Sequence, residues 1–509
     1  MSAHETSSAL NAERRSRELA ELVDGSPIDV LVVGGGITGV GIALDAATRG
    51  LSVALAEKRD LAFGTSRWSS KLAHGGLRYL ASGNVGIARE SAVERGILMT
   101  RTAPHLVRAM PQLVPLLPET SFFGKALVRV GFLAGDILRA SAKTAASVLP
   151  RSRTVGAARA AELAPAVKRD GLRGGLMAFD GQLIDDARLV VSIARTAAQH
   201  GAKILTRTGA YDVTGSSATL RDELTGQEFT VRPRIVISAA GVWAGEVDPE
   251  IGLRPSRGTH LVLSAEKLGY PTAALTVPIP GETNRFVFAL PAQLGRVYLG
   301  LTDEAAPGPV PDVPIASDEE IDFLLDTFNT VLERPLTRDD IVGTYAGLRP
   351  LLDTGDGSTA DLSRNHAVLH SKNGVISVVG GKLTTYRKMA EDAVDEAIAT
   401  ANLTAGACRT RNLPLVGAGT EEALGGVDAT PALVERYGME APLVAGSSSA
   451  ANTPVADGID VTRGEFEFAV THEGALDVDD ILDRRTRLGL VPADRERALT
   501  AAREALSAR

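Results

Sequence analysis

Three short motifs carry most of the side chains that can transfer protons or bind anions. They are TSRWSSKLAHGGLRYL (65–80), TYAGLRPLL (344–352) and VVGGKLTT (378–385). An imidazole such as that of His74 exchanges protons near neutral pH, and arginine and lysine supply the donors that an oxyanion needs. A lone arginine is more often an exposed surface residue, but these cations stand inside glycine-rich, otherwise apolar motifs. The pattern therefore favours a site for an anionic ligand.

A complete β-α-β unit for a dinucleotide lies close to the N-terminus, at residues 29–57. An apolar run predicts a buried parallel strand, and Gly34, Gly36 and Gly39 then give the spacing G-x-G-x-x-G. These glycines allow a tight turn, close approach of a pyrophosphate and close packing of helix on strand, and the helix N-terminus attracts phosphate. Glu57 ends the second strand, where a carboxylate accepts hydrogen bonds from a ribose diol. With strand, helix and acid in register, the motif is a strong signal.

The rest of the nucleotide site favours FAD over a nicotinamide cofactor. The β-α-β alternation breaks after Glu57, and further pieces of a nucleotide site recur at 237–241 and 378–388. A large cofactor that is buried along its whole length needs such distributed contacts. The predicted cofactor-binding residues are Gly34, Gly35, Gly36, Ile37, Thr38, Gly39, Glu57, Thr65, Ser66, Ser69, Ser70, Lys71, Ala240, Gly241, Gly380, Gly381, Lys382, Leu383 and Thr384.

The composition limits the partners of the protein. A chain of 509 residues with 44% hydrophobic and 23% charged residues predicts a soluble protein of two or three domains. The net charge of -8 argues against nucleic acid as the main partner. The single cysteine, Cys408, excludes an intramolecular disulfide and a thiolate metal site, and the histidines show no metal-ligand spacing, so we expect no metal. No stretch approaches the roughly 20 apolar residues that cross a bilayer, and residues 1–28 lack the apolar core of a signal peptide.

We expect an α/β fold with a Rossmann-type FAD-binding domain, an inserted antiparallel-sheet substrate domain and a helical C-terminal domain. FAD-binding segments at about 29–110, 185–245 and 340–400 alternate with substrate or cap segments. The expected division is an N-terminal arm at 1–28, an FAD-dependent oxidoreductase region at 29–400 and the helical domain at 410–509.

Periodicity predicts individual elements within this division. Patterns with a period near 3.6 predict helices at 91–100, 185–201 and 321–332. The arm is expected to be mobile, with a short helix around 14–23. Residues 204–208 and 211–231 are expected to form antiparallel hairpins, and residues 260–301 alternate as an antiparallel sheet does.

Residues 122–148 form a further candidate helix with two distinct faces. Its basic balance suits anionic headgroups at a membrane surface, although a surface helix packed on its own domain is the commoner case. One face is apolar and the other is mostly basic: Phe123, Leu127, Val130, Leu133 and Ile137 against Lys125, Arg129, Asp136, Arg139 and Lys143.

The three motifs together resemble those of the FAD-dependent, quinone-linked glycerol-3-phosphate dehydrogenases, which belong to the D-amino-acid-oxidase-like flavoprotein group. The resemblance covers residue 29 to about residue 490, and FAVTHEGALDVDDILDRRTRLG (468–489) is similar to that family's C-terminal domain. It implies an enzyme that oxidises sn-glycerol 3-phosphate to dihydroxyacetone phosphate by hydride transfer to FAD.

The resemblance also implies the substrate-binding residues. Arg78, Arg349 and Lys382 stand at the family's phosphate-site positions, and Tyr79 adds a hydroxyl donor. The family often carries Thr-Thr-Asp after the sheet strand, where this chain has Leu301-Thr302-Asp303. That departure puts in doubt a hydrogen bond at Leu301 but leaves the phosphate cluster intact.

The oxidation requires a base for the proton of the substrate hydroxyl. His74 is the first candidate, because the glycines beside it allow close approach to the flavin, and His260 in GTHLVL is the second. Either histidine has a structural role as its alternative. Arg349 is expected to stabilise developing negative charge, and Trp68 either shields the flavin ring or only packs.

Two electron acceptors remain possible, a membrane quinone and oxygen. Relatives of this type pass electrons to a membrane quinone, and a branch of them uses oxygen and forms peroxide. We expect the quinone-linked enzyme, cytoplasmic and peripheral on the cytosolic face of an anionic membrane, with a homodimer as an open option. The alternatives are an oxygen-using oxidase, an FAD-dependent dehydrogenase of another 2-hydroxy acid, and a non-catalytic flavin-binding protein.

Overall fold

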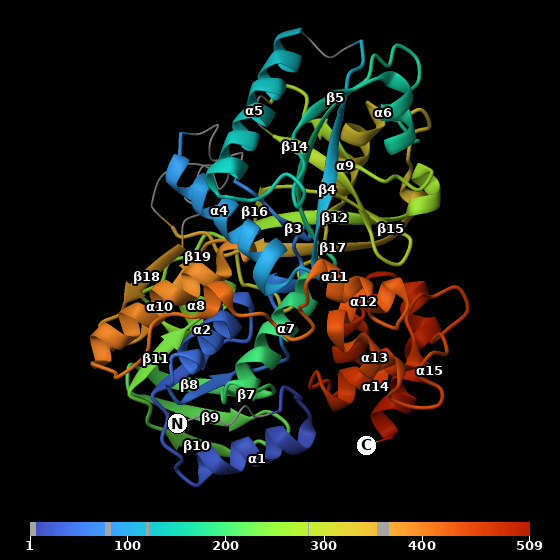
Figure 1. Ribbon diagram of the computed structural model, residues 1–509. Helices are drawn as coiled ribbons and strands as arrows, with labels where there is room; N and C mark the ends of the chain where they lie inside the picture. Colours follow the sequence, from blue (N-terminus) through green and yellow to red (C-terminus); the bar gives the residue numbers. More distant parts are fainter. Residues whose placement is uncertain (1–6, 77–82, 119–121, 283–284, 354–365, 509) are drawn as a thin grey trace.

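A computed structural model describes residues 7–76, 83–118, 122–282, 285–353 and 366–508 of the chain. It shows two large sheets and a separate group of helices near the C-terminus (Figure 1). The α-helices are α1 (Ala12–Val23), α2 (Ile37–Thr48), α4 (Val85–Ile97), α5 (Phe122–Ser141), α6 (Ala157–Leu163), α7 (Asp186–Gln199), α8 (Ala244–Val247), α9 (Asp318–Asn329), α10 (Tyr386–Ala401), α11 (Glu421–Gly425), α12 (Pro431–Tyr437), α13 (Ala441–Ala445), α14 (Arg463–Thr471) and α15 (Pro492–Ser507).

The first sheet is the nucleotide-binding unit that the glycine motif predicts. Its strand order is β18-β19-β11-β1-β2-β7, parallel except for the β18–β19 pair. All four residues of β1 are buried, since α2, α7 and α10 pack with Val30 and Val32, and a second core that includes Leu19 and Leu22 covers Leu31 and Val33. The strands are β1 (Val30–Val33), β2 (Val53–Ala56), β7 (Lys203–Leu205), β11 (Ile235–Ser238), β18 (His366–His370) and β19 (Ile376–Gly380).

The second sheet is the inserted domain, and it is antiparallel except for the β13–β4 pair. Its ten strands include the path β16-β12-β15-β14-β13-β4-β6-β3, with β17 paired to β12 and β5 to β6. Its own apolar core lies between the sheet, α6 and α9. The strands are β3 (Leu72–Ala73), β4 (Val107–Pro115), β5 (Arg153–Val155), β6 (Gly175–Leu183), β12 (Ser256–Ser264), β13 (Ala274–Pro278), β14 (Phe286–Ala292), β15 (Arg296–Gly300), β16 (Glu304–Ala305) and β17 (Ile341–Arg349).

Two expectations about smaller elements need correction. The N-terminal segment is packed from residue 7 onward, because Arg15 in α1 donates to Thr206 O and Asp222, and Leu19 and Leu22 are buried. Residues 203–205 join the parallel sheet as β7 instead of a hairpin. A three-stranded antiparallel sheet follows, formed by β8 (Thr208–Thr214), β9 (Ser217–Asp222) and β10 (Glu228–Val231).

The predicted helices are present with shifted ends. The helix expected at 91–100 begins earlier, as α4, and continues into a π-helical turn at Leu98–Thr102. The helix expected at 185–201 is α7, whose N-cap Asp185 accepts a hydrogen bond from the amide of Arg188, and the one expected at 321–332 is α9.

Helix α5 ends at Ser141 rather than at 148, because Lys143 adopts a left-handed backbone conformation with φ 60°. The inward side of the helix carries both apolar and basic residues. Val128, Phe132 and Leu138 pack against the protein, Arg129 donates to Ser152, and the buried Arg139 donates to Thr144 O. The outward side is apolar, with Val130, Leu133 and Ile137 exposed by 63%, 45% and 70%. Among the helices of the described residues, none is long and apolar enough to cross a membrane.

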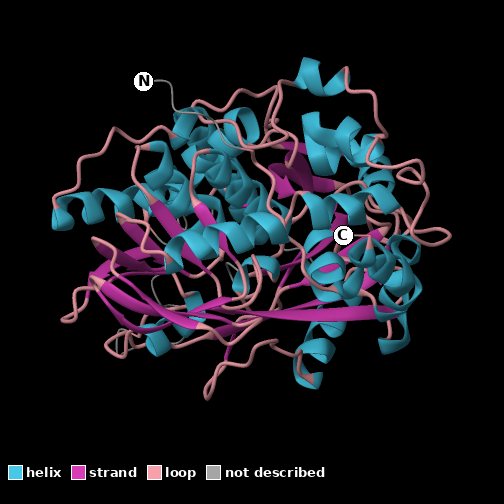
Figure 2. Ribbon diagram, turned by 90° about the horizontal axis from the view of Figure 1, so that it is seen from below, coloured by secondary structure: helices cyan, strands magenta, loops and turns pink. Residues whose placement is uncertain are grey.

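The C-terminal helices α11–α15 enclose their own small apolar cores. Both views show them gathered beside the two sheets (Figure 1, Figure 2). They attach to the nucleotide unit through buried ion pairs, such as Arg188–Glu473 and Arg195–Glu440, both of which start from α7.

Candidate functional site

One large cavity of about 1330 Å³ lies between the two sheets. It begins at the carboxyl ends of β1, β2, β11 and β19, which is where ligands bind in parallel α/β sheets. It continues along β4, β6, β12, β14 and β17 of the antiparallel sheet, and α5 forms a further wall. Its volume exceeds the roughly 300–1,000 Å³ of a pocket for one drug-sized ligand. The cavity therefore has room for a long cofactor together with a small substrate.

The glycine turn at the first end of the cavity has the geometry of a phosphate cradle. Gly34 has φ +110°, a conformation that side-chain-bearing residues rarely adopt, and a Cβ there would lie 2.6 Å from Ala239 O. A Cβ at Gly39 would lie 1.9 Å from Gly34 O. Gly36 lines the cavity as the N-cap of α2 without a side-chain cap of its own.

The end of β2 and the following loop complete this cradle. Ser66 Oγ accepts a hydrogen bond of 2.9 Å from the Ile37 amide at the start of α2. Glu57 lines the cavity, and its carboxylate accepts hydrogen bonds from the amides of Gly35 (2.6 Å) and Arg59 (2.7 Å). Burial raises the pKa of Glu57, and the two amides oppose that rise.

The loop after β2 uses several of its predicted donors within the protein. Thr65 Oγ1 donates to Leu348 O at 2.6 Å, and Ser69 donates to Asp186 through both its amide and its hydroxyl. The side chain of Lys71, at the end of the loop, is buried and does not line the cavity. It is 1% exposed, and its ammonium donates to Arg67 O, Ser69 O and Asp186. Burial, opposed by Asp186, lowers the pKa of Lys71 to about 8.

The distant pieces of the predicted cofactor site reach the same cavity. Gly241 has φ +58°, and the two consecutive glycines Gly380 and Gly381 have φ +74° and +76°. The turn at 378–385 thus connects β19 to α10 in the way the motif predicts. The predicted cofactor-binding residues on the cavity wall are Gly34, Gly36, Ile37, Thr38, Glu57, Thr65, Ser66, Ser69, Ser70, Ala240, Gly241, Gly380, Gly381, Lys382, Leu383 and Thr384.

This arrangement fits FAD. A backbone cradle stands at one end, and a glycine-rich turn and a loop with hydroxyl groups stand further along one continuous cavity. Gly35 and Gly39 lie just behind the wall and shape the cradle, while Lys71 does not reach it. Arg78 and Tyr79 lie outside the described residues.

His74 lines the cavity with its side chain 45% exposed. Its Nδ1 lies 3.2 Å from Asp180 Oδ2, and the other oxygen of Asp180 accepts from Arg95 Nη1 at 2.6 Å and from the Gly75 amide at 3.1 Å. Burial alone would raise the pKa of Asp180, but Arg95 and His74 outweigh it and hold that pKa below its usual value. An ionised Asp180 holds the imidazole through Nδ1 and leaves Nε2 as the atom that can accept a proton.

His260 stands in a different environment. It is 1% exposed, its Nε2 lies 2.8 Å from Ser70 Oγ, and its ring stacks on Tyr345 with centroids 4.6 Å apart. Burial, together with the nearby charges of Lys71 and Arg349, lowers the pKa of His260 well below its usual value. A histidine that resists protonation is a weak base, whereas His74 is open to the cavity and held through Nδ1 by Asp180.

Two of the predicted phosphate-binding cations reach the cavity. Arg349, at the end of β17, donates to Ser256 Oγ and Asp303 Oδ1 at 3.1 Å and to Thr302 O at 3.2 Å. Lys382 donates to Ser91 Oγ at 2.9 Å. Both side chains line the cavity, and these contacts hold them in place.

Sequence reasoning missed Asp180 and Arg95. An acid in the otherwise apolar strand segment MAFDGQL was a usable signal, since a charge in a buried strand needs a partner. It also missed an apolar part of the wall near α5. That part includes Val114, Val128, Phe132, Phe179, Phe286 and Phe288.

The chain matches two family models, FAD-dependent oxidoreductase at residues 29–387 and C-terminal domain of alpha-glycerophosphate oxidase at residues 408–508. It is 67% identical over 510 residues to glycerol-3-phosphate dehydrogenase 1 of Mycobacterium tuberculosis, covering 98% of this chain and 99% of that protein. The mitochondrial glycerol-3-phosphate dehydrogenase of Arabidopsis thaliana is 33% identical, with 96% and 84% covered. The X-ray structure of the Bacillus halodurans glycerol-3-phosphate dehydrogenase complexed with FAD has a TM-score of 0.73 at 27% identity, covering 98% of this chain and 94% of that one.

Proposed function

Because the chain belongs to the FAD-dependent glycerol-3-phosphate dehydrogenase family, we propose that it oxidises sn-glycerol 3-phosphate to dihydroxyacetone phosphate and passes the electrons to a membrane quinone. The observation that carries this proposal is that His74, Arg349 and Lys382 all line the cavity that fits FAD.

His74 is proposed as the base of the reaction. Its Nε2 accepts the proton of the substrate's C2 hydroxyl, while ionised Asp180 accepts a hydrogen bond from Nδ1 and stabilises the imidazolium that forms. Arg95 keeps Asp180 ionised and in place. FAD, when bound, supplies the acceptor for the hydride that leaves C2.

The cations are proposed to bind the phosphate. A dianionic phosphate needs fixed donors of opposite charge, and Arg349 is held by Ser256, Asp303 and Thr302. Lys382 adds a second cation, and Arg78 and Tyr79 are proposed to complete the cluster. A 2-hydroxy acid, whose carboxylate carries one charge, would need fewer cations.

We also propose the division of the chain that the sequence suggests, with an arm at 1–28, an oxidoreductase region at 29–400 and a helical domain at 410–509. The strand order supports it, because the parallel sheet takes its strands from 30–56, 203–238 and 366–380.

The proposed membrane contact rests on the outward apolar face of α5. Val130, Leu133 and Ile137 are exposed on a helix that also forms a wall of the cavity. Such a face binds a lipid surface by burying apolar area, and the apolar wall behind it suits a quinone. The basic residues are poorer candidates for this contact than the sequence suggests, because Arg139 is buried.

Supplying glycerol 3-phosphate to the FAD-loaded enzyme on anionic vesicles that contain a long-chain quinone should give quinone reduction with little oxygen consumption. The double variant Leu133→Ser, Ile137→Ser should reduce that quinone at least tenfold more slowly, because fully burying each side chain contributes roughly 1.5–3 kcal/mol. Its rate with a water-soluble quinone analogue should be unchanged.

Leu224→Ser is the matched control, since Leu224 is 57% exposed on the turn after β9. It should leave the rate of quinone reduction on the vesicles unchanged. An equal rate in the α5 variant would refute the membrane contact, and rapid oxygen uptake without quinone would favour the oxidase.

A further inference from the structure

The loop that follows β2 has one side on the glycine turn and the other on the C-terminal domain. We propose that the C-terminal domain is a working part of the FAD site, in which Arg484, Arg485 and Arg487 position this loop (57–71) for the cofactor. The inference rests on the proposed cofactor site and assigns a role to a domain that lines none of the cavity among the described residues.

The inner side of the loop is joined directly to the phosphate cradle. The Ala62 amide donates to Gly35 O at 3.0 Å, and Ser66 Oγ accepts from the Ile37 amide at 2.9 Å. On the cradle side, the two contacts are made by the immediate sequence neighbours of Gly36. A shift of the loop would therefore move the backbone that holds the pyrophosphate.

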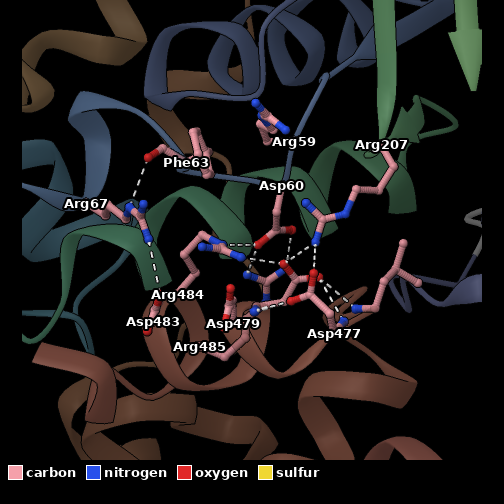
Figure 3. A network of polar contacts seen from close by, with 12 residues as sticks. Arg59, Asp60, Phe63, Arg67, Arg207, Asp477, Asp479, Asp483, Arg484 and Arg485 are labelled. Atoms are coloured by element: carbon pink, nitrogen blue, oxygen red, sulfur yellow. Dashed lines mark hydrogen bonds and ion pairs between the residues drawn. The ribbon is translucent and has the colours of Figure 1, made fainter. Parts of the chain in front are cut away.

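The outer side of the loop is anchored through Asp60. This residue is 0% exposed, and its carboxylate accepts hydrogen bonds from Arg484 Nε at 2.6 Å and from both terminal nitrogens of Arg485 at 2.9 Å (Figure 3). Burial would raise the pKa of Asp60, but the two guanidinium groups hold it well below its usual value. Arg485 also donates to Glu473 O, which fixes it within its own domain.

A second anchor lies further along the loop. Arg487 donates to Arg67 O at 2.5 Å, and its Nε lies 3.1 Å from Asp185 Oδ2 at the start of α7. The Arg67 guanidinium stacks over Trp68, 4.2 Å from its ring centre, and Trp68 is on the cavity wall. The chain of contacts thus runs from the C-terminal domain to the cavity.

The surrounding charges close the network. Arg207, just after β7 of the parallel sheet, pairs with Asp477 at 2.5 Å (Figure 3). It also pairs with Asp480 at 2.7 Å. Arg484 pairs with the same Asp480 at 2.5 Å. The C-terminal domain is therefore attached both to the loop, through Asp60, and to the end of β7, through Arg207.

The energetics of buried ion pairs favour a positioning role. Removing two charges from water costs about as much as their attraction returns, so an intact buried pair adds little net stability, whereas loss of one partner is costly. Such a network therefore restricts the loop mainly to one conformation. By linkage, a domain that holds the binding-competent loop tightens FAD binding, and bound FAD tightens docking of the domain to the same extent.

Arg485→Met tests this coupling in the full-length protein. We expect FAD to bind at least tenfold more weakly, measured by flavin fluorescence on titration of the apoprotein. Arg195→Met is the matched control, because Arg195 is also 2% exposed and makes a bidentate pair with Glu440 of the C-terminal domain without touching the loop. It should change FAD affinity less than about threefold, even if both variants lower the unfolding temperature.

Two further measurements keep the test decisive if Arg485→Met does not fold. Arg485→Lys keeps the charge but loses the forked geometry, and it should still weaken FAD binding more than the control. In the unmodified protein, FAD should slow proteolysis within 408–508. Equal FAD affinity in the Arg485 and Arg195 variants, or no protection by FAD, would overturn the proposal. Failure of the unmodified protein to bind FAD would instead refute the cofactor site itself.

Discussion

Replacing His74 with glutamine should slow anaerobic reduction of the bound flavin by glycerol 3-phosphate by about 10²–10⁴-fold, the usual contribution of a general base. The amide of glutamine keeps a polar group near Asp180 but cannot take up the proton of the substrate hydroxyl. FAD should stay bound, because the phosphate cradle lies at Gly34–Gly39 and the loop after β2. Rapid mixing under anaerobic conditions measures the rate directly.

His260→Gln is the matched comparison for this experiment. His260 lines the same cavity, but its pKa is lowered well below the usual value by burial, so its loss should slow the reaction far less. An unchanged reduction rate in the His74 variant would remove His74 as the base, and a larger loss in the His260 variant would transfer the role to His260.

Gly39→Ala should abolish FAD binding or weaken it by more than a hundredfold. An added Cβ would lie 1.9 Å from Gly34 O, and a clash with backbone cannot be relieved by a rotamer change. Helix α2 must then move away from β1, and the amides that face the pyrophosphate move with it. Flavin content after purification and titration of the apoprotein with FAD check the outcome.

Gly86→Ala supplies the control for the glycine experiment. Gly86 lies in α4, where an added Cβ meets nothing within 4 Å, so alanine should be tolerated and FAD binding unchanged. A Gly39 variant that retains normal FAD content and affinity would show that close packing of α2 on β1 is unnecessary for the site.

The glycine turn at 34–39 can be predicted from the sequence because it is local. Strand, glycine turn and helix are neighbours along the chain, and each glycine has its own backbone reason. The glycine turn at 378–385 can be predicted for the same reason, because strand, turn and helix are again neighbours along the chain. FAD and the family are confirmed by the matches at 29–387 and 408–508 and by the FAD-bound relative.

Long-range contacts are what the sequence does not reveal. Asp180 lies 106 positions from His74, and Arg485 lies 425 positions from Asp60, so no spacing rule connects them. Lys71 illustrates the converse error. Its place among hydroxyl groups suggests a cofactor contact, but the loop turns it toward Asp186 in the interior.

Helix α5 shows how an amphipathic pattern leaves its orientation undetermined. Periodicity identifies two faces but not which one meets the protein. Here Arg129 and Arg139 make internal hydrogen bonds on the same side as the packed Val128 and Phe132, and Leu133 and Ile137 are left outward.

Anaerobic titration of the FAD-loaded protein shows whether this cavity oxidises glycerol 3-phosphate with bound FAD. We predict that sn-glycerol 3-phosphate bleaches the yellow flavin and forms one dihydroxyacetone phosphate per flavin reduced, whereas lactate, a 2-hydroxy acid without phosphate, does not. A flavin that stays oxidised with glycerol 3-phosphate, or one that lactate reduces as readily, would refute the proposed activity.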